Sequence, residues 1–64
     1  MNLWDYETLN VVITDKKGSK TSGCIIAVIS AEDWDIEEDG LTLESEDGRL
    51  YGFRESEIAS IDIV

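Results

Sequence analysis

Thr21-Ser22-Gly23-Cys24-Ile25-Ile26-Ala27-Val28-Ile29-Ser30 is the longest strand candidate in this chain of 64 residues. From Cys24 to Ile29 the stretch is apolar on both faces, which is typical of a strand that is buried on both sides or curled within a barrel. Gly23 lies near its start, where a residue without a side chain lets a strand bend sharply. The stretch therefore predicts one long, bent strand at the heart of a β-structure.

Shorter strands are predicted on either side of this stretch, at residues 9–14, 41–44, 49–53 and 58–64. Their β-branched and alternating apolar residues favour strands, and in the last one Ile61 and Ile63 are expected to point into the core. Gly18 and the Asp47-Gly48 pair mark turns between strands. Five short strands at this spacing indicate an all-β barrel or sandwich in a single domain, residues 1–64.

Two short helical segments complete the prediction. Residues 2–8 suit a short N-terminal helix that Asn2 caps, and residues 55–57 suit a 3-10 turn before the last strand. The segment 31–39, here named the acidic loop, has room for one helical turn.

Composition narrows the classes of function. A domain of this size buries only about 60% of the surface of its unfolded chain, which predicts no deep pocket and argues against an enzyme. Fifteen acidic and five basic residues give a net charge of −10, which disfavours a broad phosphate-binding face and an anionic membrane surface. The single cysteine, the lack of a long apolar run and a start unlike a secretory signal predict a cytoplasmic protein.

No catalytic, cofactor or metal site is predicted. Cys24 has no histidine to activate it and is expected to pack in its strand, and zinc would need more Cys or His ligands. Asp33, Asp35 and Glu37 are spaced as in a calcium-binding EF-hand loop, but Glu38 stands where that loop needs glycine. These acids therefore predict a solvated surface and no dedicated cation site.

Two motifs resemble those of the Sm-like proteins, a branch of the SH3-like small barrels. Residues 11–25 are similar to the first Sm motif: an apolar strand, an Asp/Gly turn, then Gly23 and an apolar residue two positions on. Residues 53–61 are similar to the second, in which an apolar residue and an arginine precede a short turn and two spaced apolar residues. The resemblance implies a five-stranded SH3-like or Sm-like barrel with an N-terminal helix and a 3-10 turn before the last strand.

The positions that contact RNA in Sm-like proteins are mostly not matched. Arg54 fits the pattern, but Glu55 stands where the family has glycine, and Glu57 occupies its polar amide position. The resemblance therefore implies the fold more than RNA binding. Acidic Sm-like barrels that bind proteins are known, including a bacterial inhibitor of the transcription terminator Rho, and the charge of this chain is similar to theirs.

The candidate protein-binding residues lie in the acidic loop: Trp34, Asp35, Ile36 and Glu37. Trp34 and Ile36 either fold back to cap one end of the barrel or form an aromatic anchor within an acidic rim, a composition common at binding hot spots. The alternative RNA-binding residues are Arg54, Lys16, Lys17 and Lys20. Three lysines at a hairpin tip are more often simply solvated.

The main functional hypothesis is a non-catalytic protein-interaction module or small regulatory adaptor that binds a partner with a basic surface. The alternative is an Sm-like RNA-binding protein that acts as a homo-oligomeric ring, in which the basic residues of several subunits add up. A third hypothesis is an acidic mimic of nucleic acid that blocks a DNA- or RNA-binding protein.

Overall fold

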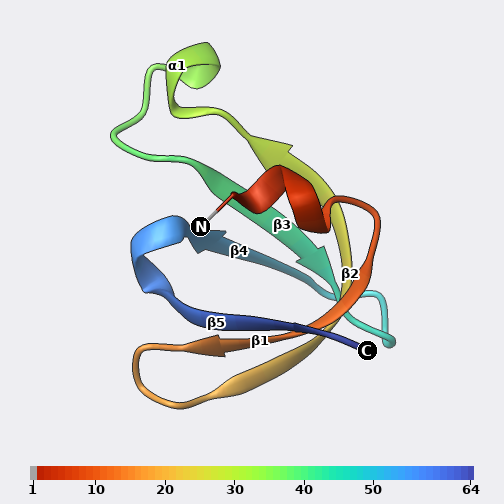
Figure 1. Ribbon diagram of the computed structural model, residues 1–64. Coiled ribbons are helices and arrows are strands. Elements are labelled where there is room, and N and C mark those ends of the chain that lie inside the picture. The colour runs from red at the N-terminus through yellow and green to blue at the C-terminus, as the bar shows by residue number, and fades with distance from the viewer. Residues whose placement is uncertain (1) are drawn as a thin grey trace.

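Figure 1 presents the computed structural model, which describes residues 2–64. The elements in chain order are η1 (Leu3–Tyr6), β1 (Asn10–Asp15), β2 (Lys20–Ile29), α1 (Ala31–Trp34), β3 (Gly40–Glu44), β4 (Leu50–Arg54), η2 (Glu55–Glu57) and β5 (Ile58–Ile63), where η denotes a 3-10 helix. The five predicted strands and the helical turns before the first and last strands are confirmed. Within residues 2–64, no helix is long and apolar enough to cross a membrane.

All five strands belong to one antiparallel sheet in the order β4-β3-β2-β1-β5. The first half of β2, Lys20–Cys24, pairs with β1, and the second half, Cys24–Ile29, pairs with β3. Because its two partners occupy different halves of β2, the sheet curls around this strand into a small barrel (Figure 1). The edge strands β4 and β5 are joined through η2.

The bend of β2 has a steric cause at Gly23. A Cβ atom at this position would overlap the backbone carbonyl of Glu44 in β3, so that the close approach of β3 requires glycine. A β-bulge between Ile25 and Ala27 adds local twist to the same strand. The prediction that a small residue is needed at this bend is therefore explained by the close contact between β2 and β3.

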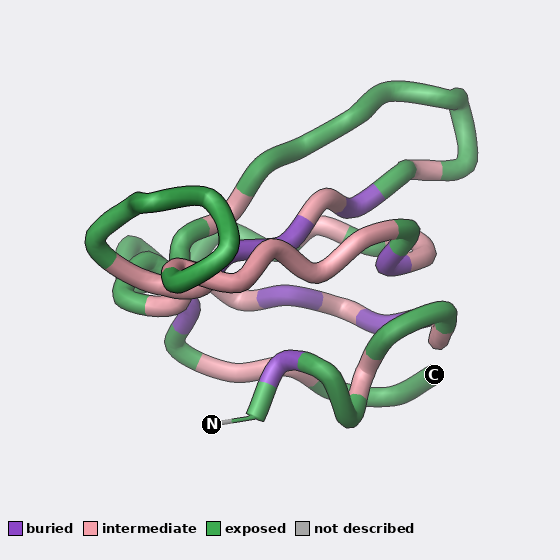
Figure 2. Tube along the Cα trace, turned by 90° about the horizontal axis from the view of Figure 1, so that it is seen from above, coloured by how far each residue is buried: buried purple, intermediate pink, exposed green. Residues whose placement is uncertain are grey.

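The core consists of seven buried apolar side chains that come from η1 and from four of the strands: Leu3, Val11, Ile13, Ile25, Leu41, Leu43 and Ile58. In Figure 2 the buried segments of the strands lie towards the middle of the trace, and the outlying loops are exposed. Full burial of one such aliphatic side chain contributes about 1.5–3 kcal/mol, so that these residues are the main stabilising group of the domain.

The last strand differs from the prediction at its C-terminal end. Ile61 packs against the core as expected, but Ile63 is 63% exposed. Ile58, at the start of β5, is the buried isoleucine instead. The ladder with β1 shifts its register between Thr14 and Asp15, which places Ile58 opposite Asp15. Ile63 pairs with the buried Val11, but β5 is an edge strand, so its other side has no neighbouring strand in the sheet.

Candidate functional site

The acidic loop connects β2 to β3 and has a defined local structure. Its first residues form α1, and Asp35 ends this helix in the left-handed conformation with φ of 51°. Aspartate tolerates that conformation better than most residues. The backbone N–H of Ile36 donates to the carbonyl of Ala31 at 3.1 Å, which closes the turn. The loop carries six carboxylates: Glu32, Asp33, Asp35, Glu37, Glu38 and Asp39.

Hydrogen bonds attach the end of the acidic loop to the barrel. The Asp39 carboxylate accepts the N–H of Ala31 at 2.8 Å, and the Asp39 carbonyl accepts the N–H of Glu55 at 2.9 Å. The Glu38 carboxylate accepts the N–H of Ser56 at 2.7 Å and its hydroxyl at 2.9 Å. η2 therefore holds the C-terminal part of the loop in place.

These contacts favour the ionised form of Glu38. The N–H of Ser56 is the largest cause that lowers the pKa of Glu38 below its ordinary value, followed by the Ser56 hydroxyl. The positive charge of Arg54 acts in the same direction, while partial desolvation opposes it. The Glu38 contact is therefore strongest where the carboxyl group is charged.

The side chain of Trp34 is 69% exposed, and that of Ile36 is 47% exposed. The interpretation that these two residues fold back to cap the barrel is therefore wrong for Trp34. None of the residues of α1 is buried, whereas η1 contributes the fully buried Leu3 to the core. The acidic loop thus presents an aromatic side chain to solvent and does not use it to fill the barrel.

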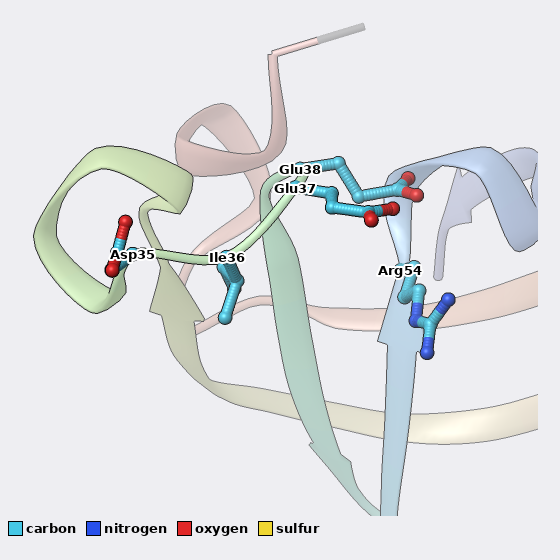
Figure 3. Close-up of a pocket in the computed structure, with 5 residues that line it drawn as sticks. All are labelled: Asp35, Ile36, Glu37, Glu38 and Arg54. Atoms are coloured by element: carbon cyan, nitrogen blue, oxygen red, sulfur yellow. The ribbon is translucent and has the colours of Figure 1, made fainter.

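A hollow of about 560 Å³ lies between the acidic loop and the end of β4. Its lining is Asp35, Ile36, Glu37, Glu38 and Arg54. Figure 3 shows the side chains of Glu37 and Glu38 extending from the loop towards β4, where Arg54 lies below them. The length of the chain predicts no deep pocket, and this hollow, although large, is open to solvent. It brings together three of the predicted protein-binding residues and adds Glu38 and Arg54 to them.

The lysines predicted as alternative RNA contacts are all exposed: Lys16, Lys17 and Lys20. The turn that carries two of them lies against η2, since the N–H of Lys16 donates to the carbonyl of Glu57 at 3.1 Å. Arg54 lines the hollow with Glu37 and Glu38, and none of the three lysines is in that lining. The hollow therefore does not bring the four candidate RNA-binding residues together.

The sequence gives little sign of the contact between Glu38 and Ser56. The two residues lie 18 positions apart and share no motif, and their meeting depends on how the sheet curls. The one available signal is that Ser56 lies between two glutamates in a predicted turn, where a free N–H and a hydroxyl are available to a distant acceptor. Sequence analysis therefore does not identify Glu38 as part of the site.

Comparisons with known proteins give no relative: no family model, no curated protein and no solved structure matches this chain. Among residues 2–64, no three side chains of the His, Cys, Asp or Glu type lie together as metal ligands would. The site is therefore interpreted from its own geometry.

Proposed function

We propose that this chain is a non-catalytic protein-interaction module, a small regulatory adaptor of the cytoplasm, whose partner has a basic surface. The contact residues are Trp34, Asp35, Ile36 and Glu37. One observation carries the proposal: Trp34 is exposed on a loop that is rich in carboxylates and attached to the barrel by hydrogen bonds. An aromatic anchor within a polar rim is a common composition of binding hot spots.

Charge supports a basic partner. The net charge of −10 attracts basic surfaces over a distance and raises their rate of encounter. The sequence has no histidine, and the hollow is open to solvent. Both support a role without catalysis, because carboxylates that are all solvated lack the different environments that would make one an acid and another a base.

We also propose that the chain is an Sm-like barrel. The order of elements supports this: a helical turn, four strands, a 3-10 turn and a last strand follow one another as the resemblance implies. RNA binding as a ring is the weaker alternative, because Glu37 and Glu38 share the hollow with Arg54 and would repel a phosphate there. A mass measurement by size exclusion and an RNA filter-binding assay at low salt separate the two functions.

The test is affinity capture from the native host followed by mass spectrometry, with Trp34→Ala and Asp35→Lys variants in parallel. Capture of a basic protein that both variants weaken supports the proposal. Capture that neither variant changes contradicts the assignment of the site.

A further inference from the structure

A second depression, of about 290 Å³, lies beside the hollow, over β3 and β4. The two depressions share Ile36, Glu38 and Arg54 in their linings and therefore lie next to each other. Thr42 and Gly52, which pair in the β3–β4 ladder, lie in the second depression. We name this combined feature the loop–sheet groove.

The two ends of the loop–sheet groove differ in chemistry. Three of the five residues that line the hollow end are acidic: Asp35, Glu37 and Glu38. The sheet end has an aliphatic wall, with Ile29 and Ile36 in its lining. Gly52 adds open space there, since a Cβ built on it would meet no atom within 4 Å. A ligand that fills both ends needs a charged group next to an apolar one.

We propose that the loop–sheet groove binds an extended segment of a partner protein in which a Lys or Arg side chain stands two positions from an aliphatic side chain, so that both point to the same face. The inference rests on the proposed function and names the chemistry that the site recognises. The basic side chain enters the acidic hollow, and the aliphatic side chain two positions away lies over Gly52 against Ile36. Trp34 lies outside the linings of both depressions and contacts the partner beside this segment.

Charge complementarity selects this occupant. Four carboxylates line the two depressions against the single guanidinium of Arg54: Asp35, Glu37, Glu38 and Glu57. A nucleic-acid strand would bring phosphates to these carboxylates, and a second copy of the chain would bring a further net charge of −10. A basic segment of a different protein meets neither repulsion.

The probe is a displayed library of random peptides, selected on the immobilised full chain at low salt. Affinities of the enriched peptides are then measured for the wild type and for two groove variants, Gly52→Leu and Glu37→Lys. Gly52→Leu fills the sheet end and Glu37→Lys reverses a charge at the hollow end. Ser22→Leu at an exposed position of β2 and Glu46→Lys in the β3–β4 turn are the matched controls. Circular dichroism and thermal unfolding establish that each variant is folded.

The expected result is enrichment of Lys or Arg two positions from Leu, Ile or Val, with affinity at least about tenfold lower for both groove variants and unchanged for both controls. The inference is overturned by failure to enrich any sequence, by enrichment of acidic sequences, or by full affinity for Gly52→Leu. A dimer of the chain that Gly52→Leu dissociates would also overturn it, because the occupant would then be a second copy.

The affinity of the captured partner protein for the Trp34→Ala and Gly52→Leu variants distinguishes a failure of this inference from a failure of the proposed function. If Trp34→Ala weakens its binding and Gly52→Leu does not, the interaction module stands and the groove assignment fails. If neither variant has an effect, both fail.

Discussion

Glu38 of the acidic loop accepts two hydrogen bonds from Ser56 of η2, one from the backbone N–H at 2.7 Å and one from the hydroxyl at 2.9 Å. This contact joins the loop that exposes Trp34 to the segment between the two edge strands of the barrel. A loop that is ordered before it meets its partner loses less conformational entropy on binding. The contact between Glu38 and Ser56 therefore helps to order the proposed interaction surface before a partner binds.

The contact between Glu38 and Ser56 is expected to weaken in acid. Because the pKa of Glu38 is depressed in the folded state, the stability that its charge contributes is fully present above the ordinary value of 4.5 and is lost as the pH falls through the lower folded pKa. In an NMR titration, the amide signal of Ser56 should shift with a midpoint below 4.5. Glu38→Gln is the control and should abolish that shift; a midpoint above 4.5 would contradict the contact.

Gly23 and Gly52 should respond oppositely to alanine. Gly23→Ala drives a Cβ into the carbonyl of Glu44, and such overpacking costs about 1–3 kcal/mol. Gly52→Ala meets only open space and should be neutral or stabilise the strand by about 0.5–1 kcal/mol. Urea unfolding of the two variants measures the difference, and an equal loss of stability in both would refute the steric argument.

Thr8 stores backbone strain. Its φ is 70°, which is costly for a β-branched residue, and its N–H donates to the carbonyl of Ile25 at 2.8 Å. Thr8→Gly should relieve this strain, which costs about 1–2 kcal/mol for a residue with a Cβ in the left-handed conformation. Because glycine loses more conformational entropy on folding, the net stabilisation should be about 0.5–1 kcal/mol.

Thermal unfolding measures this gain as a rise of about 4–8 °C per kcal/mol. Thr8→Ala keeps a Cβ at the strained position and should gain less. Equal midpoints for the alanine and glycine variants would show that Thr8 is not strained.

Two isoleucines test the assignment of the core. Ile25 is fully buried, and its replacement by alanine should cost about 2–5 kcal/mol through lost burial and a cavity. Ile63 is mostly exposed, and the same replacement there should change the free energy of unfolding by no more than about 0.5 kcal/mol. A large loss for Ile63→Ala in chemical unfolding would restore the prediction that this residue belongs to the core.

Salt should stabilise the domain. The fifteen acidic side chains repel one another on a small body, and added salt screens this repulsion. The ion pair between Arg49 and Asp47 is highly exposed and offers little attraction for salt to weaken. The thermal midpoint should therefore rise between low and moderate salt, whereas a flat or falling midpoint would contradict the dominance of self-repulsion.

The parts of this fold that are predictable from sequence depend on local rules. The apolar run from Cys24 to Ile29 identifies the central strand because no polar residue interrupts it. Gly18 and Gly48 mark the two hairpin turns, and both adopt positive φ. Apolar periodicity and turn-forming residues are features of residues close together in the chain, so they can be recognised in a single sequence.

The parts that are not predictable depend on how distant segments meet. Ile63 has the spacing of a core residue, but it lies near the end of an edge strand and is mostly exposed. The exposure of Trp34 depends on the path of a loop without periodicity, and the loop–sheet groove depends on the contact between Glu38 and Ser56 across the chain. The sequence therefore identifies the loop residues of the candidate site and the turn at 55–57, but not the contact that joins them.

The most direct measurement is the affinity of a captured partner for the full chain, titrated in parallel against Trp34→Ala and Trp4→Ala. Trp4 is the matched control because it is also exposed, at 43%, but belongs to η1. The account predicts a loss of about 2 kcal/mol or more for Trp34→Ala, about thirtyfold in Kd, and almost none for Trp4→Ala. Unchanged affinity for Trp34→Ala, or an equal loss for both variants, would contradict the role of the acidic loop.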